Sequence, residues 1–263
     1  MTAVYVETVG LAAPGLPSWR EGSATLRGEH PFVHAVLPLH TPLLLPVNER
    51  RRATPAIRLA FQAAEDSMNA TALSAASLAT VFASSDADLA IIHRICLALT
   101  ATPRFISPTD FHNSVHNAAA GYWSIAAGTR AASTTISAYD GSFAAGLLEA
   151  CLQVQVDGCD ALLVAFDLPA PEPLKPTRPI AFPAAVALVL TRQPTAQSLA
   201  ALSCATTAAA ETPLADTALE QVRLGNPASR ALPLLQRLAL RRFEGVVLPM
   251  AAGANLSVEL SAP

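Results

Sequence analysis

The chain has 263 residues, a formal net charge of −3, and hydrophobic side chains at 52% of its positions against 14% charged. The one basic cluster is a run of arginines at residues 50–52, so the charge pattern argues against a nucleic-acid-binding protein. A chain of this length forms one large α/β domain or two that share a sheet system. So high an apolar share predicts several buried layers, or a face that a partner chain covers.

The four cysteines have apolar neighbours and no Cys-x-x-Cys spacing; they are Cys96, Cys151, Cys159 and Cys204. This pattern predicts buried free thiols in a reducing compartment, and no zinc site. No apolar run reaches the roughly 18 residues of a membrane span. The N-terminus lacks the basic and apolar regions of a signal peptide. We therefore expect a cytoplasmic protein without a metal or cofactor.

The first half of the chain alternates strands and helices. The predicted elements are a strand (2–13), a mostly irregular Pro- and Gly-rich segment (14–48), a helix (53–68), a strand (78–84), a helix (86–99) and a helix within 109–127. Thr54 and Pro55 fit the N-cap and the first position of their helix. The helix at 86–99 is expected to turn one side to the core, made of Leu89, Ile92, His93 and Cys96.

The stretch from residue 105 to residue 167 organises the chain. Residues 133–138 are a β-branched run typical of a buried strand, 139–142 a tight polar break, 143–154 an apolar helix and 161–166 a second apolar strand. Strand, turn, helix and strand predict a βαβ unit whose parallel sheet is buried on both faces. Many α/β enzymes hold their nucleophile at such a turn, which makes it the candidate site.

The second half is less regular. A linker at 168–179 has five prolines in twelve residues and is expected to be extended. The elements predicted after it are a strand (184–191), an Ala/Thr-rich surface segment (205–217), a helix (229–240) and two closing strands (245–249 and 256–260). Ser229 is the candidate N-cap of the helix.

Four motifs of the organising stretch carry a family resemblance. They are Ile-Ser-Pro (106–108), Asn-Ala-Ala-Ala-Gly-Tyr-Trp-Ser-Ile-Ala-Ala-Gly (117–128), Thr-Thr-Ile-Ser-Ala-Tyr-Asp-Gly-Ser (134–142) and Asp-Gly-Cys-Asp-Ala-Leu-Leu-Val-Ala (157–165). The second resembles the Asn-x-x-Ala-Gly-His-x-Ser-Ile-x-x-Gly helix of the β-ketoacyl synthases. The third resembles the strand and elbow that hold their catalytic cysteine.

This resemblance implies the thiolase-like fold, with layers in the order α-β-α-β-α. Residues 1–204 resemble a nearly complete N-terminal half. Residues 205–263 resemble a reduced remnant of the C-terminal half, a helix plus closing strands. Their last part, 251–260, is similar to the closing Gly-Gly-x-Asn strand pair of the family.

The same resemblance implies that the chain has lost the family's chemistry. Counting from Gly128 places Asp140 where the family has its cysteine, or Tyr139 if the register shifts by one residue. An acyl-aspartate is a mixed anhydride, which is uphill from a thioester, and a carboxylate cannot be activated as a thiolate is. The family's two catalytic histidines lie in its C-terminal half, and this chain has no histidine after His116.

Inactive ketosynthase-like subunits are known as chain-length factors, and a small version resembles the partner in aryl polyene biosynthesis. The resemblance implies a heterodimer with a full-length β-ketoacyl synthase, and contact with an acyl carrier protein through that complex. The implied interface strand is Thr134, Thr135, Ile136 and Ser137. The residues implied to reach the partner's acyl tunnel are Thr109, Asp110, Phe111 and His112.

Other interpretations stay open. Asp140 and Ser142 could serve a free-standing acyl-thioester hydrolase or decarboxylase, or the chain could be a structural or regulatory homodimer. Asp140 could instead cap the helix that follows it. His112 and His116, four residues apart, suggest a metal pair on one helix face, although partner-facing polar positions fit them as well. Tyr122 and Trp123 fit helix packing better than a ligand shelf.

Overall fold

The computed structural model describes residues 3–251 and 253–263. Its strands are β1 (Val4–Ala12), β2 (Ala79–Ala83), β3 (Ser133–Ile136), β4 (Ala161–Asp167), β5 (Ala184–Thr191), β6 (Ala200–Thr207), β7 (Val246–Ala251) and β8 (Ala254–Ser261). Its α-helices are α1 (Trp19–Leu26), α2 (Val47–Arg52), α3 (Pro55–Met68), α4 (Leu89–Thr100), α5 (Pro108–Asn113), α6 (Ala118–Ala127), α7 (Ser142–Leu152), α8 (Thr217–Gly225) and α9 (Leu232–Leu240). Two 3₁₀ turns matter for the site, η2 (Tyr139–Gly141) and η4 (Ala228–Ala231).

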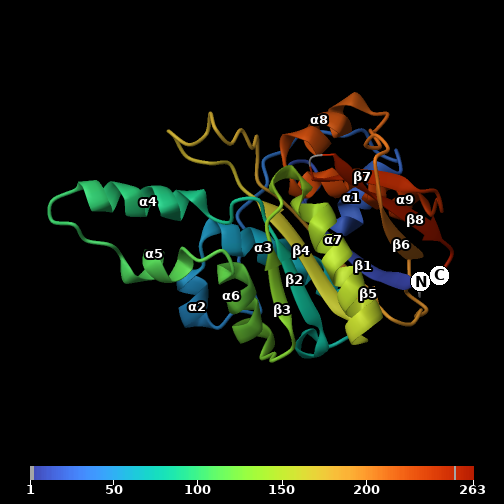
Figure 1. The fold of residues 1–263 in the computed structure, drawn as a ribbon, viewed down its shortest axis with the longest axis horizontal. Coiled ribbons are helices and arrows are strands. Elements are labelled where there is room, and N and C mark those ends of the chain that lie inside the picture. The colour runs from blue at the N-terminus through green and yellow to red at the C-terminus, as the bar shows by residue number, and fades with distance from the viewer. Residues whose placement is uncertain (1–2, 252) are drawn as a thin grey trace.

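The strands form one sheet in the order β3-β2-β4-β5-β1-β6-β8-β7 (Figure 1). β3 and β4 both pair in parallel with β2, which lies between them, and the remaining pairs are antiparallel. The predicted βαβ unit is therefore confirmed, with β2 inserted between its two strands. β2, β4 and β5 are buried at every position, which explains their unbroken apolar sequences.

Helix α7 lies between two parts of this sheet, and two glycines make room for it. A Cβ atom at Gly146 would come within 2.8 Å of Ala83 and 2.9 Å of Leu163, on β2 and β4. On the other side, a Cβ atom at Gly141 would lie 1.9 Å from the carbonyl oxygen of Met250 on β7. The sheet therefore wraps around α7, so that β6, β8 and β7 form a second β layer. β6 runs through residue 204, where the two halves were predicted to meet.

The outer face of the first β layer is covered by α3 and α6. Thr54 accepts a hydrogen bond from the N–H of Ile57 at 3.4 Å and Pro55 opens α3, so the predicted helix start is confirmed. Phe61 of α3 packs against Trp123 of α6, with ring centroids 5.2 Å apart. Tyr122 and Trp123 are both fully buried, as helix packing requires.

Residues 14–48 are mostly irregular, as predicted, although they contain the helix α1, in which Ser18 accepts a hydrogen bond from the N–H of Glu21 and so caps the first turn. β6 and α8 reach into the Ala/Thr-rich segment 205–217, most of which is exposed, as predicted. The prediction that Ser229 caps a helix is wrong, because its buried hydroxyl has no hydrogen-bond partner and a 3₁₀ turn precedes α9, which begins at Leu232.

Helix α4 has a different buried side from the predicted one. Ile91 is its only buried residue, whereas Ile92 and Cys96 are exposed. The reason is visible in Figure 1, where α4 and α5 project from the body as an arm instead of lying on the sheet. Of the other cysteines, Cys151 is buried and Cys159 and Cys204 are half-buried; all four are free. In the part of the chain that the structure describes, every helix is too short or too polar to cross a membrane.

Candidate functional site

The turn between β3 and α7 is a sharp elbow, as the sequence predicts. Tyr139 stands at its apex with φ of +52°, a conformation that costs a non-glycine residue free energy. The Ser142 hydroxyl donates a hydrogen bond to the Tyr139 carbonyl at 2.7 Å and accepts one from the Ala138 N–H at 3.0 Å. Ser142 is thus buried and holds the strained backbone in place.

Asp140 does not cap the helix that follows, so that prediction is wrong. Gly141 is the N-cap residue of α7, and no side chain accepts a hydrogen bond there. The Asp140 carboxylate instead faces two guanidinium groups, with Oδ1 at 2.7 Å from Arg178 Nη1 and Oδ2 at 3.8 Å from Arg230 Nη2. A hydrogen bond from Arg178, with the charge of Arg230 nearby, holds a carboxylate more strongly than neutral backbone N–H groups at a helix end.

Arg178 ties the Pro-rich linker to the elbow. Residues 172–177 of the linker form consecutive turns, so the linker is not extended as predicted. The turns bring the Arg178 guanidinium carbon to 3.9 Å from the centroid of the Tyr139 ring. Arg178 Nε also donates to Asp86 Oδ2 at 2.6 Å. Burial lowers the pKa of Arg178, but hydrogen bonds to Asp140 and Asp86 outweigh it and raise the pKa above its ordinary value.

A buried carboxyl lies behind this ion pair, at the end of β4. Asp167 Oδ1 accepts from Ser84 Oγ at 3.0 Å and from the Ser85 N–H at 2.8 Å. Complete burial raises the pKa of Asp167 to about 7, although the hydrogen bonds from Ser85 and Ser84 lower it. Asp167 therefore holds a proton in neutral solution far more readily than an exposed aspartate does.

Ion pairs continue from the elbow toward α8. Arg230 Nη1 lies 3.5 Å from Glu211 Oε2, which also pairs with Arg223 at 2.7 Å. Arg223 in turn pairs with Glu220 at 2.6 Å, within α8. Hydrogen bonding to Arg223 is the main cause that lowers the pKa of Glu220. The elbow is thus the middle of a chain of charges that reaches from the end of β2 to α8.

An open pocket lies beside the elbow. It has a volume of about 340 Å³ and is lined by Tyr139, Asp140, Glu211, Met250 and Asn255 among others. Its two carboxylates already face arginines. Among residues 3–251 and 253–263, no group of three or more His, Cys, Asp or Glu side chains is arranged to hold a metal ion.

The two candidate histidines lie in different environments. Helix α5 ends at Asn113, so His112 and His116 do not share a helix face, and that interpretation is wrong. The His112 ring packs edge-on to Tyr122, with centroids 6.2 Å apart. His116 Nε2 lies 3.1 Å from the Ser84 carbonyl oxygen.

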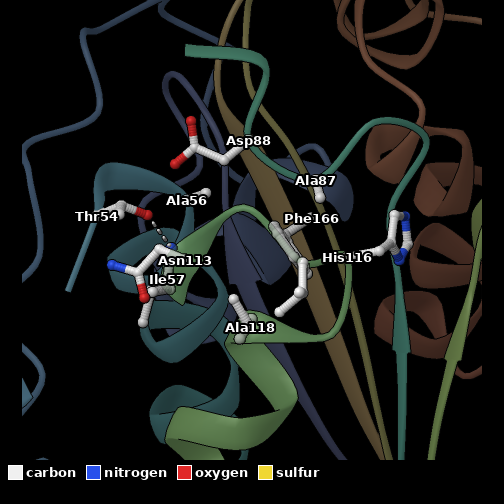
Figure 2. A pocket seen from close by; sticks show the side chains of 11 residues that line it. Thr54, Ala56, Ile57, Ala87, Asp88, Asn113, His116, Ala118 and Phe166 are labelled. Atoms are coloured by element: carbon white, nitrogen blue, oxygen red, sulfur yellow. Dashed lines mark hydrogen bonds between the residues drawn. The ribbon is translucent and has the colours of Figure 1, made fainter. Parts of the chain in front are cut away.

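A small cavity lies under the loop between α5 and α6. Figure 2 shows Thr54 and Asn113 on one side of it and His116 on the other. Its free volume is about 10 Å³, which is room for about one water molecule. Asn113 donates to the Arg52 carbonyl at 3.1 Å while its buried Oδ1 has no partner, so a single water fits here and an acyl chain does not.

The predicted interface strand is an edge strand. Among the described residues β3 pairs with β2 alone, and its side chains are half-buried or exposed, so the prediction of a buried strand is wrong. Ala132 and Ile136 direct their carbonyl groups toward β2. The backbone N–H and C=O groups of successive residues point to opposite sides of a strand, so those of Ser133 and Thr135 point to the free edge. Ser137 Oγ donates to the Ser85 carbonyl at 2.8 Å.

The other predicted interface residues begin α5 in the arm. Asp110 forms a two-pronged ion pair with Arg94 of α4, at 2.8 and 3.1 Å, which joins the two helices. The hydrogen bond from Arg94 is the main cause that lowers the pKa of Asp110. Thr109 and His112 are exposed, and Phe111 has 69% of its surface exposed. The arm also exposes Ile92, Leu97, Leu99, Phe105 and Val115.

Sequence reasoning missed the charged residues around the elbow. Asp86, Arg178 and Arg230 come from three distant segments, so no local spacing connects them. One signal was present, because Arg178 stands between Thr177 and Pro179 in a linker with few charges. A lone arginine there needs a carboxylate partner once it is buried.

The eight-stranded sheet and its helices form the mixed α/β fold of a thiolase-like ketosynthase domain. Residues 27–242 match the family model described as the N-terminal domain of beta-ketoacyl synthase, and the chain belongs to this family. No curated protein matches the chain.

Solved structures agree with this assignment. The chain is similar to a ketosynthase (ApeO) in complex with its chain length factor (ApeC) from Xenorhabdus doucetiae, with a TM-score of 0.72 and 24% identity over 98% of this chain and 100% of that chain. It is also similar to the ishigamide ketosynthase/chain length factor, with a TM-score of 0.74 and 12% identity over 98% and 99% of the two chains. A third similar structure is AntDE:AntF, a type II PKS acyl-carrier protein in complex with its ketosynthase. Its TM-score is 0.75, and it is 14% identical to this chain over 100% of this chain and 99% of that chain. The predicted thiolase-like ketosynthase fold is confirmed.

Proposed function

We propose that this chain is a non-catalytic, chain-length-factor-like subunit that pairs with an active β-ketoacyl synthase and shapes its acyl tunnel. The complex would act in polyene or polyketide biosynthesis, in the cytoplasm, on chains held by an acyl carrier protein. The observation that carries the proposal is the elbow. Its apex is Tyr139, its carboxylate is held by two arginines, and its one hydroxyl nucleophile holds the backbone.

The strained apex favours Tyr139 over Asp140 as the equivalent of the family's cysteine. A nucleophile elbow places its reactive side chain at the residue with the unfavourable backbone conformation. Here that residue is Tyr139, with φ of +52°. Its ring is covered by Arg178 on one face. The group that covers this phenol is a guanidinium, which is always protonated and cannot accept the phenol's proton.

Two surfaces suit a ketosynthase partner. The free edge of β3 offers unpaired N–H and C=O groups, which a strand of the partner can use to extend the sheet. The arm offers the exposed apolar side chains of α4 and α5, which fit the buried centre of a protein interface. Solved structures that pair a ketosynthase with a chain length factor share the fold of this chain.

The start of α5 is the part that we assign to the acyl tunnel. Thr109, Phe111 and His112 are exposed on α5, beside the ion pair of Arg94 and Asp110 that joins the two helices of the arm. A residue fixed in this way can block a tunnel at a defined depth. We assign residues 1–204 to the ketosynthase N-terminal-like part and residues 205–263 to a reduced C-terminal part.

The alternative is a free-standing acyl-thioester hydrolase or decarboxylase that uses Asp140 or Ser142. The geometry gives it little support. Ser142 is 1% exposed and its hydroxyl is engaged twice, while Asp140 is neutralised by Arg178.

The decisive experiment is co-expression with a candidate full-length ketosynthase, followed by size-exclusion chromatography and a condensation assay. We expect a one-to-one complex whose activity or product length depends on this chain. The variant Thr135→Pro removes an N–H at the free edge of β3 and leaves the β2 pairing intact, so it should weaken the complex. Thr135→Val keeps the N–H and is the matched control. A stable monomer or homodimer that ignores every ketosynthase would refute the proposal.

A further inference from the structure

Two cysteines from distant parts of the chain meet in the core. Cys151 is in the last turn of α7 and Cys204 is in β6, 53 residues further along the chain, and their sulfur atoms lie 3.9 Å apart. A disulfide needs sulfur atoms about 2.05 Å apart, so each sulfur has to move about 1 Å. Rotation about the Cα–Cβ bonds supplies a movement of this size. The two other cysteines are placed differently, with Cys96 on the exposed arm and Cys159 donating to the Gln153 carbonyl at 3.5 Å.

The two thiols differ in access, which sets the order of reaction. Cys151 is 3% exposed, whereas Cys204 is half-buried and reaches solvent. The neighbouring Cys204 sulfur and burial both raise the pKa of Cys151 well above its ordinary value. An oxidant therefore reacts with Cys204 first, and Cys151 is the resolving thiol that reacts with the oxidised Cys204.

We propose that Cys151 and Cys204 are a reversible oxidation site, where a peroxide drives formation of an intramolecular disulfide between α7 and β6. The Cys204 thiolate attacks a peroxide oxygen, the O–O bond breaks, and hydroxide leaves behind a sulfenic acid. Cys151 sulfur then attacks the Cys204 sulfur and the S–O bond breaks. The leaving hydroxide takes up the proton of the Cys151 thiol as water. Two thiols lose two electrons, and one hydrogen peroxide becomes two water molecules.

The bond would lock the helix that begins at the elbow. α7 starts at Ser142, which holds the strained turn, and ends beside Cys151. β6 belongs to the second β layer, on the other side of α7. A covalent link between them closes a loop that contains β4, β5 and the Pro-rich linker. This inference depends only on the fold, so its test is independent of whether the chain pairs with a ketosynthase.

The test uses the full chain with Cys96→Ser and Cys159→Ser, purified alone or with a ketosynthase, and treated with hydrogen peroxide. Thiols are then alkylated under denaturing conditions and mapped by mass spectrometry. We expect both remaining thiols to be protected from alkylation, a cross-linked peptide joining Cys151 to Cys204, and full recovery with dithiothreitol. The melting temperature should rise by roughly 5–10 °C on oxidation, because the unfolded chain is constrained.

Further variants separate the proposal from non-specific oxidation. Cys204→Ser should leave Cys151 free to be alkylated after the same treatment, because its buried thiol no longer has a partner. Cys151→Ala should leave Cys204 as sulfenic acid, which dimedone traps. Two alkylatable thiols after peroxide treatment, or Cys204 as sulfinic acid beside a free Cys151, would overturn the proposal.

Discussion

The hydroxyl oxygen of Ser85 lies 2.6 Å from the buried carboxyl of Asp167. The same oxygen lies 2.8 Å from Asp86 Oδ2, and a hydroxyl has one hydrogen to donate. The ionised carboxyl of Asp167 and that of Asp86 compete for this one hydrogen, whereas a protonated Asp167 can donate to Ser85 and leave the Ser85 hydrogen for Asp86. Asp86 in turn accepts from Arg178, so the protonated state of Asp167 fits the charges around the elbow.

This arrangement predicts that stability falls as pH rises from about 4 to about 7. The pKa of Asp167 is about 7 in the folded chain and near its ordinary value of 3.8 in the unfolded chain. Between these values the folded chain binds more protons than the unfolded chain, so the free energy of unfolding decreases with pH. Asp167→Asn keeps a neutral side chain at every pH. It should therefore remove the pH-dependent decrease in the free energy of unfolding, which is on the order of 4 kcal/mol at most.

Urea unfolding at several pH values measures this effect. Asp157→Asn, at an exposed acid, is the matched control and should leave the pH profile unchanged. The other charges facing this carboxyl are Asp86 and, beyond it, Arg178 and Asp140. A profile that is the same in the Asp167→Asn variant and the original chain would contradict the protonated state.

A second prediction concerns Arg178. Arg178→Ala leaves Asp86 and Asp140 without their main partner. It should lower the free energy of unfolding by about 2 kcal/mol, a value reduced because both carboxylates are partly exposed. Arg178→Lys keeps the charge but cannot span both carboxylates, so it should recover only part of the loss. Urea unfolding gives the measurement, with exposed Arg192→Ala as the control. Full recovery of stability by the Lys variant would show that the fork geometry is irrelevant.

The fold was largely predictable because its signals are local. Thr54 and Pro55 mark a helix start, and the unbroken apolar run of β4 marks a strand buried on both faces. The errors have one cause, which is that tertiary position overrides local pattern. The β-branched run at β3 is an edge strand, and the apolar side of α4 faces outward, because both lie at the margin of this single chain.

The site was predictable only in outline. The elbow could be placed from composition and turn residues, yet the partners of Asp140 could not. Arg178 lies 38 positions from Asp140 and reaches it only because the linker folds into turns. Burial of Asp167 likewise follows from the packing of β4 and not from its neighbours in sequence.

A third prediction tests whether the elbow takes part in condensation. In a complex with an active ketosynthase, Tyr139→Phe keeps the ring under Arg178 and removes the hydroxyl, so the condensation rate should stay within about twofold. Asp140→Asn should have the same small effect on rate. A loss of about 100-fold by either variant, in a complex that still elutes as one species, would mean that this chain performs chemistry.

The last prediction concerns Phe111, which is 69% exposed on the arm. If it closes the far end of the partner's tunnel, Phe111→Ala should lengthen the acyl product and Phe111→Trp should shorten it, while the one-to-one complex persists. Product length by mass spectrometry is the measurement. Val33→Ala, at an exposed apolar side chain outside the arm, is the matched control. Because a tunnel wall acts by volume, an unchanged product in both Phe111 variants would remove this residue from the tunnel.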